Sequence, residues 1–217
     1  MDDITGAVTI TSSDDNLWTF SQMNDLSIAV GGAPNAPIKW NATGNAAVLG
    51  GTPPNGKFGF QVKNRFFIGN TAANPSRIAW SILSNPEDWS GAGSGTEDVW
   101  TNDGDALTGY AILSNDVTLL FKNNSVHKMI TTTAPFPIFP LFGDIGCPGP
   151  GAVTVYGGVA YFMTSDGKFY ATDGSTLTIL PDDDIDDILS ALNITRIKYV
   201  RSTFMTGDGY KWIIWSV

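Results

Sequence analysis

Residues 159–180 read VAYFMTSDGKFYATDGSTLTIL, and this stretch predicts the fold. Three runs rich in branched and aromatic residues follow one another, and an Asp-Gly pair stands at each break, at Asp166-Gly167 and Asp173-Gly174. Asp-Gly between apolar runs is a strong hairpin signal, because glycine readily adopts the positive φ that a tight turn needs. The stretch therefore predicts three antiparallel strands joined by short turns, which is a meander.

Similar runs recur along the whole chain of 217 residues. Their centres are spaced by about 39, 52, 42 and 52 residues, close to the length of a propeller blade. The sequence predicts an all-β protein, a β-propeller of about five blades built from antiparallel meanders, in a single domain over residues 1–217. An N-terminal strand over residues 6–12 is expected to close the ring with the C-terminal strand. The runs are Leu26–Val30, Arg65–Ile68, Val117–Phe121, Val159–Met163 and Tyr210–Trp215.

Three segments depart from this pattern. Residues 182–192 begin with aspartates and place four aliphatic residues on one helical face, so they predict one short helix. Residues 90–95 alternate glycine with small residues and predict an extended, mobile loop. Residues 134–142 alternate proline and apolar residues; since proline cannot donate to a central ladder, an edge strand or a rigid crossing segment is expected.

The composition excludes several kinds of site. The net charge of −9 opposes ordinary nucleic-acid binding, which needs a basic surface. One cysteine, Cys147, and one histidine, His127, rule out a disulfide framework and the usual zinc sites. We expect a buried thiol and a half-exposed strand histidine, no catalytic residue, no metal, no cofactor and no enzyme activity. No apolar run is long enough to span a membrane, and no signal peptide is predicted.

Two alternatives stay open at this point. The chain has 7 Trp, 6 Tyr and 12 Phe, enough to build sugar-stacking platforms, so a carbohydrate-binding, lectin-like propeller is one alternative. A glycosidase-like propeller is the other, because glycoside hydrolysis needs two carboxylates across a pocket. Turn aspartates need no catalytic explanation, which weakens this second reading. The candidate carboxylates are Glu87, Asp88, Glu97, Asp98, Asp103 and Asp105.

One part of the sequence is more specific. It runs Lys63–Asn70 (KNRFFIGN), then Asn74–Ser81 (NPSRIAWS), then Asn85–Trp89 (NPEDW). The three phrases in this order resemble tail proteins of tailed bacteriophages, including the tail-nozzle and packaged-DNA-stabilising propellers of short-tailed phages. The blades over residues 117–127 and 146–167 are similar to them too, so the resemblance covers roughly residues 58–215.

This resemblance implies a structural virion component, made in the host cytoplasm. It would be a tail or head–tail connector propeller that assembles with other tail proteins, as a ring of several copies around a DNA channel, with no specific nucleic-acid binding and no membrane. Members of that family are commonly longer, and this chain stops inside an apolar strand. Either that strand closes the ring beside Val8–Ile10, or the chain is a piece of a longer protein.

The phrase also indicates which residues to examine. Asn74-Pro75 and Asn85-Pro86 are expected to fix turns on either side of a half-buried strand. We expect Arg77 to pair with Asp88 or Glu87 if it is buried, or to meet a neighbouring subunit if it is exposed, and Trp89 to close a hydrophobic plug under the loop. The candidate interaction residues are Arg77, Trp80, Glu87, Asp88 and Trp89.

Overall fold

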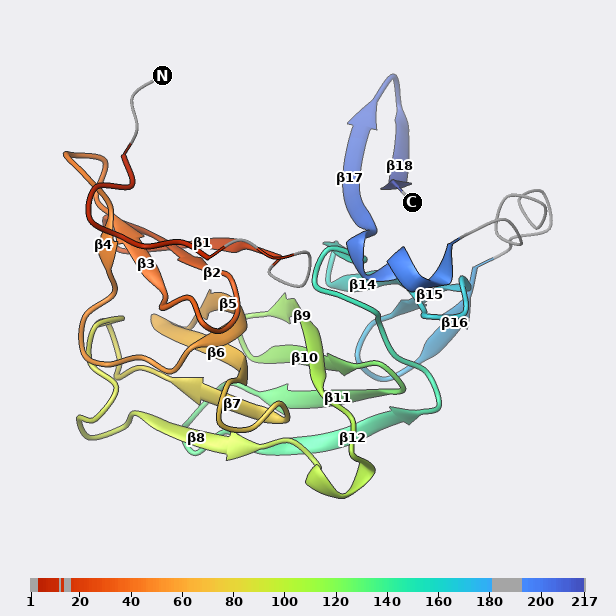
Figure 1. Cartoon of the computed structure of the whole chain (residues 1–217). Coiled ribbons are helices and arrows are strands. Elements are labelled where there is room, and N and C mark those ends of the chain that lie inside the picture. The colour runs from red at the N-terminus through yellow and green to blue at the C-terminus, as the bar shows by residue number, and fades with distance from the viewer. Residues whose placement is uncertain (1–3, 12, 14–16, 181–192, 217) are drawn as a thin grey trace. The chain divides into compact units, whose positions relative to one another are not determined.

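The structure is a computed structural model that describes residues 4–11, 13, 17–180 and 193–216 (Figure 1). These residues group into two compact units, where the sequence suggested one domain. The first unit comprises Met1–Gly104 and Thr133–Phe136, and the second comprises Asp105–Thr132 and Pro137–Val217. The helix expected near 182–192 lies outside the described residues.

The first unit contains two four-stranded antiparallel sheets, each with its strands in chain order. A short 3-10 turn, η1 (Thr101–Asp103), follows the second sheet. The first sheet consists of β1 (Thr19–Met23), β2 (Leu26–Val30), β3 (Ile38–Trp40) and β4 (Ala47–Val48). The second consists of β5 (Gly56–Val62), β6 (Arg65–Thr71), β7 (Arg77–Trp80) and β8 (Gly95–Asp98).

The second unit has two more four-stranded sheets and a two-stranded one, again antiparallel and in chain order. One sheet consists of β9 (Leu107–Ser114), β10 (Val117–Lys122), β11 (Ser125–Ile130) and β12 (Ile138–Gly143). The next consists of β13 (Val153–Tyr156), β14 (Val159–Met163), β15 (Phe169–Thr172) and β16 (Leu177–Ile179). The 3-10 helix η2 (Ile194–Tyr199) leads to the hairpin of β17 (Arg201–Gly207) and β18 (Tyr210–Ser216).

The meander architecture expected from the sequence is therefore confirmed, with five sheets in the described residues. Residues 159–180 form β14, β15 and β16 with the turns at the predicted places. The β17–β18 hairpin turns at Asp208 and Gly209, both with positive φ (49° and 79°), as a type I′ turn requires. Neither described helix is long and apolar enough to cross a membrane.

The cores consist of the second strands and their neighbours. In the first unit Phe66 and Ile68 of β6 pack with Ile28, Val30 and Leu49. In the second unit the rings of Phe121 in β10 and Phe162 in β14 lie 5.0 Å apart, and both side chains are fully buried. Each core therefore joins adjacent sheets within its own unit.

Two sequence expectations, one of an N-terminal strand and one of an extended loop, were wrong in part. Residues 6–11 form no strand; in the described contacts Thr11 exchanges two hydrogen bonds with the Asn35 side chain, and the Ile4 carbonyl accepts from Ala46 N–H. Closure of a ring stays a prediction. Residues 90–94 are turns rather than an extended loop, and Gly95 already belongs to β8. By contrast, β12 contains Pro140 and lies at the edge of its sheet, as predicted.

Replacing Phe121 by alanine tests the core of the second unit. Phe121→Ala removes a fully buried ring that contacts Phe162, so we expect a loss of about 3–5 kcal/mol in the free energy of unfolding. Phe20→Ala is the control, since Phe20 is 75% exposed and its removal should change stability by no more than about 0.5 kcal/mol. Urea denaturation followed by tryptophan fluorescence measures both, and equal effects would contradict the described core.

Candidate functional site

The phrase that resembles phage tail proteins folds into one sheet of the first unit. Residues 63–70 form the β5–β6 turn and most of β6, residues 74–81 form the entry to β7 and β7 itself, and residues 85–89 lie in the loop before β8. Lys63 and Asn64 both have positive φ (51° and 54°), which places a type I′ turn between β5 and β6. The three phrases thus supply β6, β7 and part of the loop that leads to β8.

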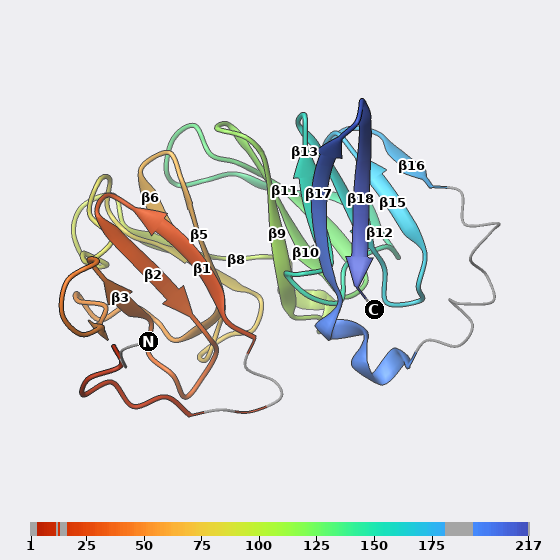
Figure 2. The same cartoon turned by 90° about the horizontal axis from the view of Figure 1, so that it is seen from above.

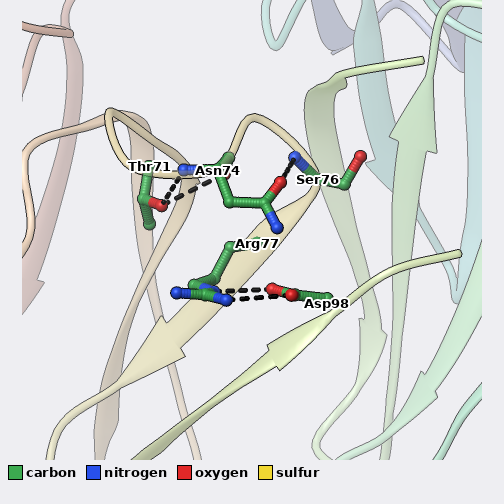
Figure 3. Close-up of polar contacts among 5 residues, drawn as sticks. All are labelled: Thr71, Asn74, Ser76, Arg77 and Asp98. Atoms are coloured by element: carbon green, nitrogen blue, oxygen red, sulfur yellow. Dashed lines mark hydrogen bonds and ion pairs between the residues drawn. The ribbon is translucent and has the colours of Figure 1, made fainter. Parts of the chain in front are cut away.

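Arg77 and Asp98 form a paired charge on this strand pair (Figure 3). They stand directly opposite each other in the β7–β8 register. Arg77 Nε donates to Asp98 Oδ1 at 2.6 Å and Nη2 to Oδ2 at 2.9 Å, a bidentate geometry that favours the charged form of both groups. The hydrogen bond from Arg77 lowers the pKa of Asp98, and the same bond raises the pKa of Arg77. The pairing of Arg77 with Asp88 or Glu87 expected from the sequence is therefore wrong.

The turn before β7 is fixed by its own polar side chains (Figure 3). The Asn74 side chain accepts from the Ser76 N–H at 3.0 Å, and the Thr71 hydroxyl accepts from the Asn74 N–H at 3.2 Å. The turn expected at Asn74-Pro75 is confirmed. Because it sets where β7 begins, it also sets the register that places Arg77 opposite Asp98.

Glu87 links the loop between β7 and β8 to the first sheet. Its Oε1 accepts from Lys39 Nζ at 2.5 Å and from the Gly50 N–H at 2.8 Å. The bond from Lys39 lowers the pKa of Glu87, with the Gly50 amide contributing in the same direction. A side chain at residue 50 would meet this carboxylate, since a Cβ there would lie 2.5 Å from Oε1. A larger residue at position 50 would therefore displace the Glu87 carboxylate.

The other three candidates have internal contacts. Asp88 Oδ1 accepts from the N–H groups of Ser90 and Gly91, which closes a turn. Trp89 donates from Nε1 to the Pro86 carbonyl at 2.8 Å and packs against the core of the first unit, so the predicted hydrophobic plug is confirmed. Trp80 is 3% exposed, and its Nε1 donates to the Gly93 carbonyl.

Arg77 and Trp89 both line an open pocket of about 280 Å³ in the first unit. Thr52, Thr71 and Thr96 supply hydroxyl groups to its wall. Trp80, Glu87 and Asp88 do not line it. The sequence alone did not pair Arg77 with Asp98, because 14 residues of turn and loop (81–94) separate the end of β7 at Trp80 from the start of β8 at Gly95. The two residues face each other only in the folded register.

The described residues do not form the usual catalytic arrangements. Cys147 is buried, as expected, and burial raises the pKa of its thiol to about 12, so a thiolate is not available. His127 lies in strand β11 as expected, but it is 2% exposed rather than half-exposed; its Nε2 lies 3.0 Å from the Ser125 hydroxyl. Glu87 and Asp98 have lowered pKa values, whereas a general acid needs a raised one. Within the described ranges, no three His, Cys, Asp or Glu residues cluster as metal ligands would.

Comparison with known proteins bears on the fold. No protein-family model and no curated protein matches the chain. The structure is similar to that of BamB from Moraxella catarrhalis, a β-propeller, with a TM-score of 0.50 and 12% identity over 77% of this chain and 51% of that one. The chain has a β-propeller fold. A protein described as exported, from Bacteroides fragilis, matches with a TM-score of 0.49 and 14% identity over 80% of this propeller and 53% of that chain.

A third similar structure is YCF48 from Cyanidioschyzon merolae, with a TM-score of 0.40 and 8% identity over 94% of this chain and 81% of that one. The propeller chain spans about half the length of the first two structures. At these identities the likeness concerns the fold alone. The resemblance of the phrase to phage tail proteins stays a prediction.

A double-mutant cycle tests the Arg77–Asp98 pair. Arg77→Ala and Asp98→Asn should each lower the free energy of unfolding at pH 7, with a coupling energy of about 0.5–1 kcal/mol because the pair is partly exposed. The folded-state pKa of Asp98 is lowered, so its contribution is present above the unfolded pKa near about 3.9 and is lost as pH falls through the folded value. Urea titrations at neutral and acidic pH measure this, and a coupling unchanged by acid would contradict it.

Proposed function

We propose that the chain is a structural virion component, a β-propeller of a bacteriophage tail or head–tail connector. It assembles with other tail proteins, as a ring of several copies, around the channel through which DNA passes. The observation that carries the proposal is the ordered phrase over residues 63–89, which resembles the tail propellers and lies in β6, β7 and the loop before β8.

The contacts of the phrase residues support a structural role. Asn74 fixes the entry to β7, Arg77 ties β7 to β8, and Glu87 ties the following loop to Lys39. Such residues maintain the shape of a surface instead of performing chemistry on it. Beside them, Arg77, Trp89 and the threonines of the pocket present cationic, aromatic and hydroxyl groups, which suit a polar side chain of a neighbouring protein.

The charge also supports the proposal. A net charge of −9 repels the phosphate backbone, so DNA can pass a surface of this chain without being held there. Glu87 and Asp98 have lowered pKa values because Lys39 and Arg77 donate to them, and thus both stay ionised through neutral pH.

Solution mass tests the assembly. Light scattering on a sizing column should give a defined higher oligomer of the 23.2 kDa chain, and averaged images of that oligomer should show a ring with a channel. Thr96→Tyr, which fills the pocket from the exposed side of β8, should lower the oligomer fraction. Thr178→Tyr is the matched control, an exposed threonine in the edge strand β16. A monomer at every concentration would contradict the proposal.

A carbohydrate-binding role is the second candidate, and one observation favours it. An open pocket of about 270 Å³ in the second unit is lined by Asn123, Asn124, Asp144, Asp166 and the ring of Tyr170. Planar amides and carboxylates beside an aromatic ring suit a hydroxyl-rich ligand. Asp105 accepts from the Asn123 side chain at 2.7 Å and from the Asn124 N–H at 2.9 Å, which holds the turn in place.

A glycan-binding screen separates the two candidates. The lectin-like reading requires a saturable signal that Asp144→Ala and Asn124→Ala abolish, while Thr96→Tyr, in the first unit, leaves it unchanged. A monomer that binds glycans in this way would favour the second candidate over the first.

A further inference from the structure

The pocket of the first unit has a small apolar floor between longer side chains. It lies where the first and second sheets pack side by side (Figure 2), and its volume of about 280 Å³ is close to the lower end of ligand sites, roughly 300 Å³. Ala79 of β7, which is 1% exposed, forms the floor, and Arg77 and Trp89 line the walls. Pro54, from the linker between β4 and β5, adds a second apolar ring. A flat apolar group of a ligand can therefore enter beside two rings.

Arg77 is the strongest polar group of the pocket, and a guanidinium can only donate. Its Nε and Nη2 donate to Asp98, and Nη1 lies on the side of the guanidinium that faces away from that carboxylate (Figure 3). Within the described residues Asp98 is the sole hydrogen-bond partner of the Arg77 side chain. A guanidinium carries five N–H groups, so three of them remain for a ligand.

The rest of the lining offers hydroxyl groups and no strong acceptor. Among the described residues that line the pocket there is no carboxylate and no side-chain amide. Trp89 Nε1 already donates to the Pro86 carbonyl, and the Thr71 hydroxyl bonds to the Asn74 backbone. Thr96 adds an exposed hydroxyl at the rim. The pocket therefore suits a ligand that accepts hydrogen bonds and has few to donate.

The charge of Arg77 does not by itself require an anionic ligand. The hydrogen bond from Arg77 lowers the pKa of Asp98, so this carboxylate is ionised at neutral pH and the pair is neutral overall. A second carboxylate at Nη1 would share one guanidinium with Asp98 and be repelled by it, and a cation would face the guanidinium directly. A neutral acceptor, such as a peptide carbonyl, meets neither repulsion.

The walls of the pocket are fixed before a ligand arrives. The Gly50 N–H donates to Glu87, and a Cβ at Gly51 would lie 1.9 Å from the Glu87 carbonyl oxygen, so the linker and the β7–β8 loop touch backbone to backbone. Pro53-Pro54 further restricts the linker, because each proline ring locks its own φ. A ligand therefore loses little affinity to ordering of the pocket.

We propose that this pocket binds a proline-containing segment of a neighbouring protein in the polyproline II conformation. This inference rests on the proposed function and defines the group that the neighbour supplies: a proline ring lies on Trp89, and a carbonyl beside it accepts from Arg77 Nη1. Proline has no N–H, and a polyproline II backbone makes no internal hydrogen bonds, so such a segment presents acceptors and few donors. These groups match a pocket with donors beside an aromatic ring.

A sugar fits this pocket less well than it fits the pocket of the second unit. Each sugar hydroxyl donates as well as accepts, so a sugar site needs carboxylates or amides as acceptors. Asn123 and Asp144 supply them in the second unit, whereas the lining around Arg77 has donors and hydroxyls.

Blocked oligopeptides test the inference on the full chain. The probe is acetyl-hexaproline amide, which is neutral and adopts polyproline II. We expect saturable binding with a Kd below about 1 mM, followed by NMR through the indole N–H signal that Trp89→Phe removes. The hexamer of N-methylglycine also lacks backbone N–H groups but has no rings, so it should bind at least about tenfold more weakly.

Two adjacent alanines supply a matched pair of variants. Ala73→Trp places a ring in the pocket from its exposed rim and should weaken hexaproline binding at least about tenfold. Ala72→Trp is the control, because Ala72 is exposed and does not line the pocket. Arg77→Lys keeps a cation for Asp98 but lacks the second guanidinium edge, and should also weaken binding about tenfold. Circular dichroism and thermal unfolding confirm that the variants fold.

Three results would overturn the inference. One is no saturable binding of hexaproline up to about 1 mM. Another is tighter binding of acetyl-hexaglutamate amide, which would make the occupant an acidic segment. The third is a neutral glycan that binds more tightly than hexaproline and is displaced by Ala73→Trp. A ring-forming chain that does not bind hexaproline keeps the proposed function, and a monomer that binds it keeps this site without the ring.

Discussion

Burial of the second strand of each four-stranded sheet is the constraint on which the rest of the structure depends. β6 and β10 are buried on both faces and hydrogen-bonded on both edges, so their side chains are apolar in continuous runs rather than in alternation. Phe66, Phe67 and Ile68 have no exposed surface at all. The other three strands of each sheet help to cover these apolar runs and exclude water from them. Polar residues are found in the turns between the strands.

This constraint explains why the sequence predicts the sheets well. A continuous apolar run followed by a two-residue turn is a local signal, and residues 159–180 and the β17–β18 hairpin both carry it. Proline in residues 134–142 carries a local signal too, because it cannot donate to a central ladder. In each case the residues that decide the structure lie within a few positions of one another.

The sequence predictions that were wrong concern contacts between residues that a long loop separates. Arg77 meets Asp98 only because the β7–β8 register brings them together across the loop, and the nearer carboxylates of Glu87 and Asp88 are occupied by Lys39 and by turn amides. Residues 90–94 have a flexible composition, yet the carbonyl of Gly93 accepts from both Arg65 and Trp80, which closes the segment into turns. The glycine-rich composition predicts a flexible segment, but hydrogen bonds from residues elsewhere in the sheet fix its conformation.

The hydrogen bonds of the acidic residues also bear on function. Asp88, Asp105 and Asp173 accept from backbone amides in turns, and Glu87 and Asp98 accept from cationic side chains, so these acids serve the fold. The Thr176 amide and the Ser175 hydroxyl lower the pKa of Asp173, just as the cations lower those of Glu87 and Asp98, and all three stay ionised well into the acid range. Asp88, Asp105 and Asp173 thus contribute to the net charge of −9 while closing turns. Negative charge on a surface can therefore arise from residues that close turns, without a dedicated site.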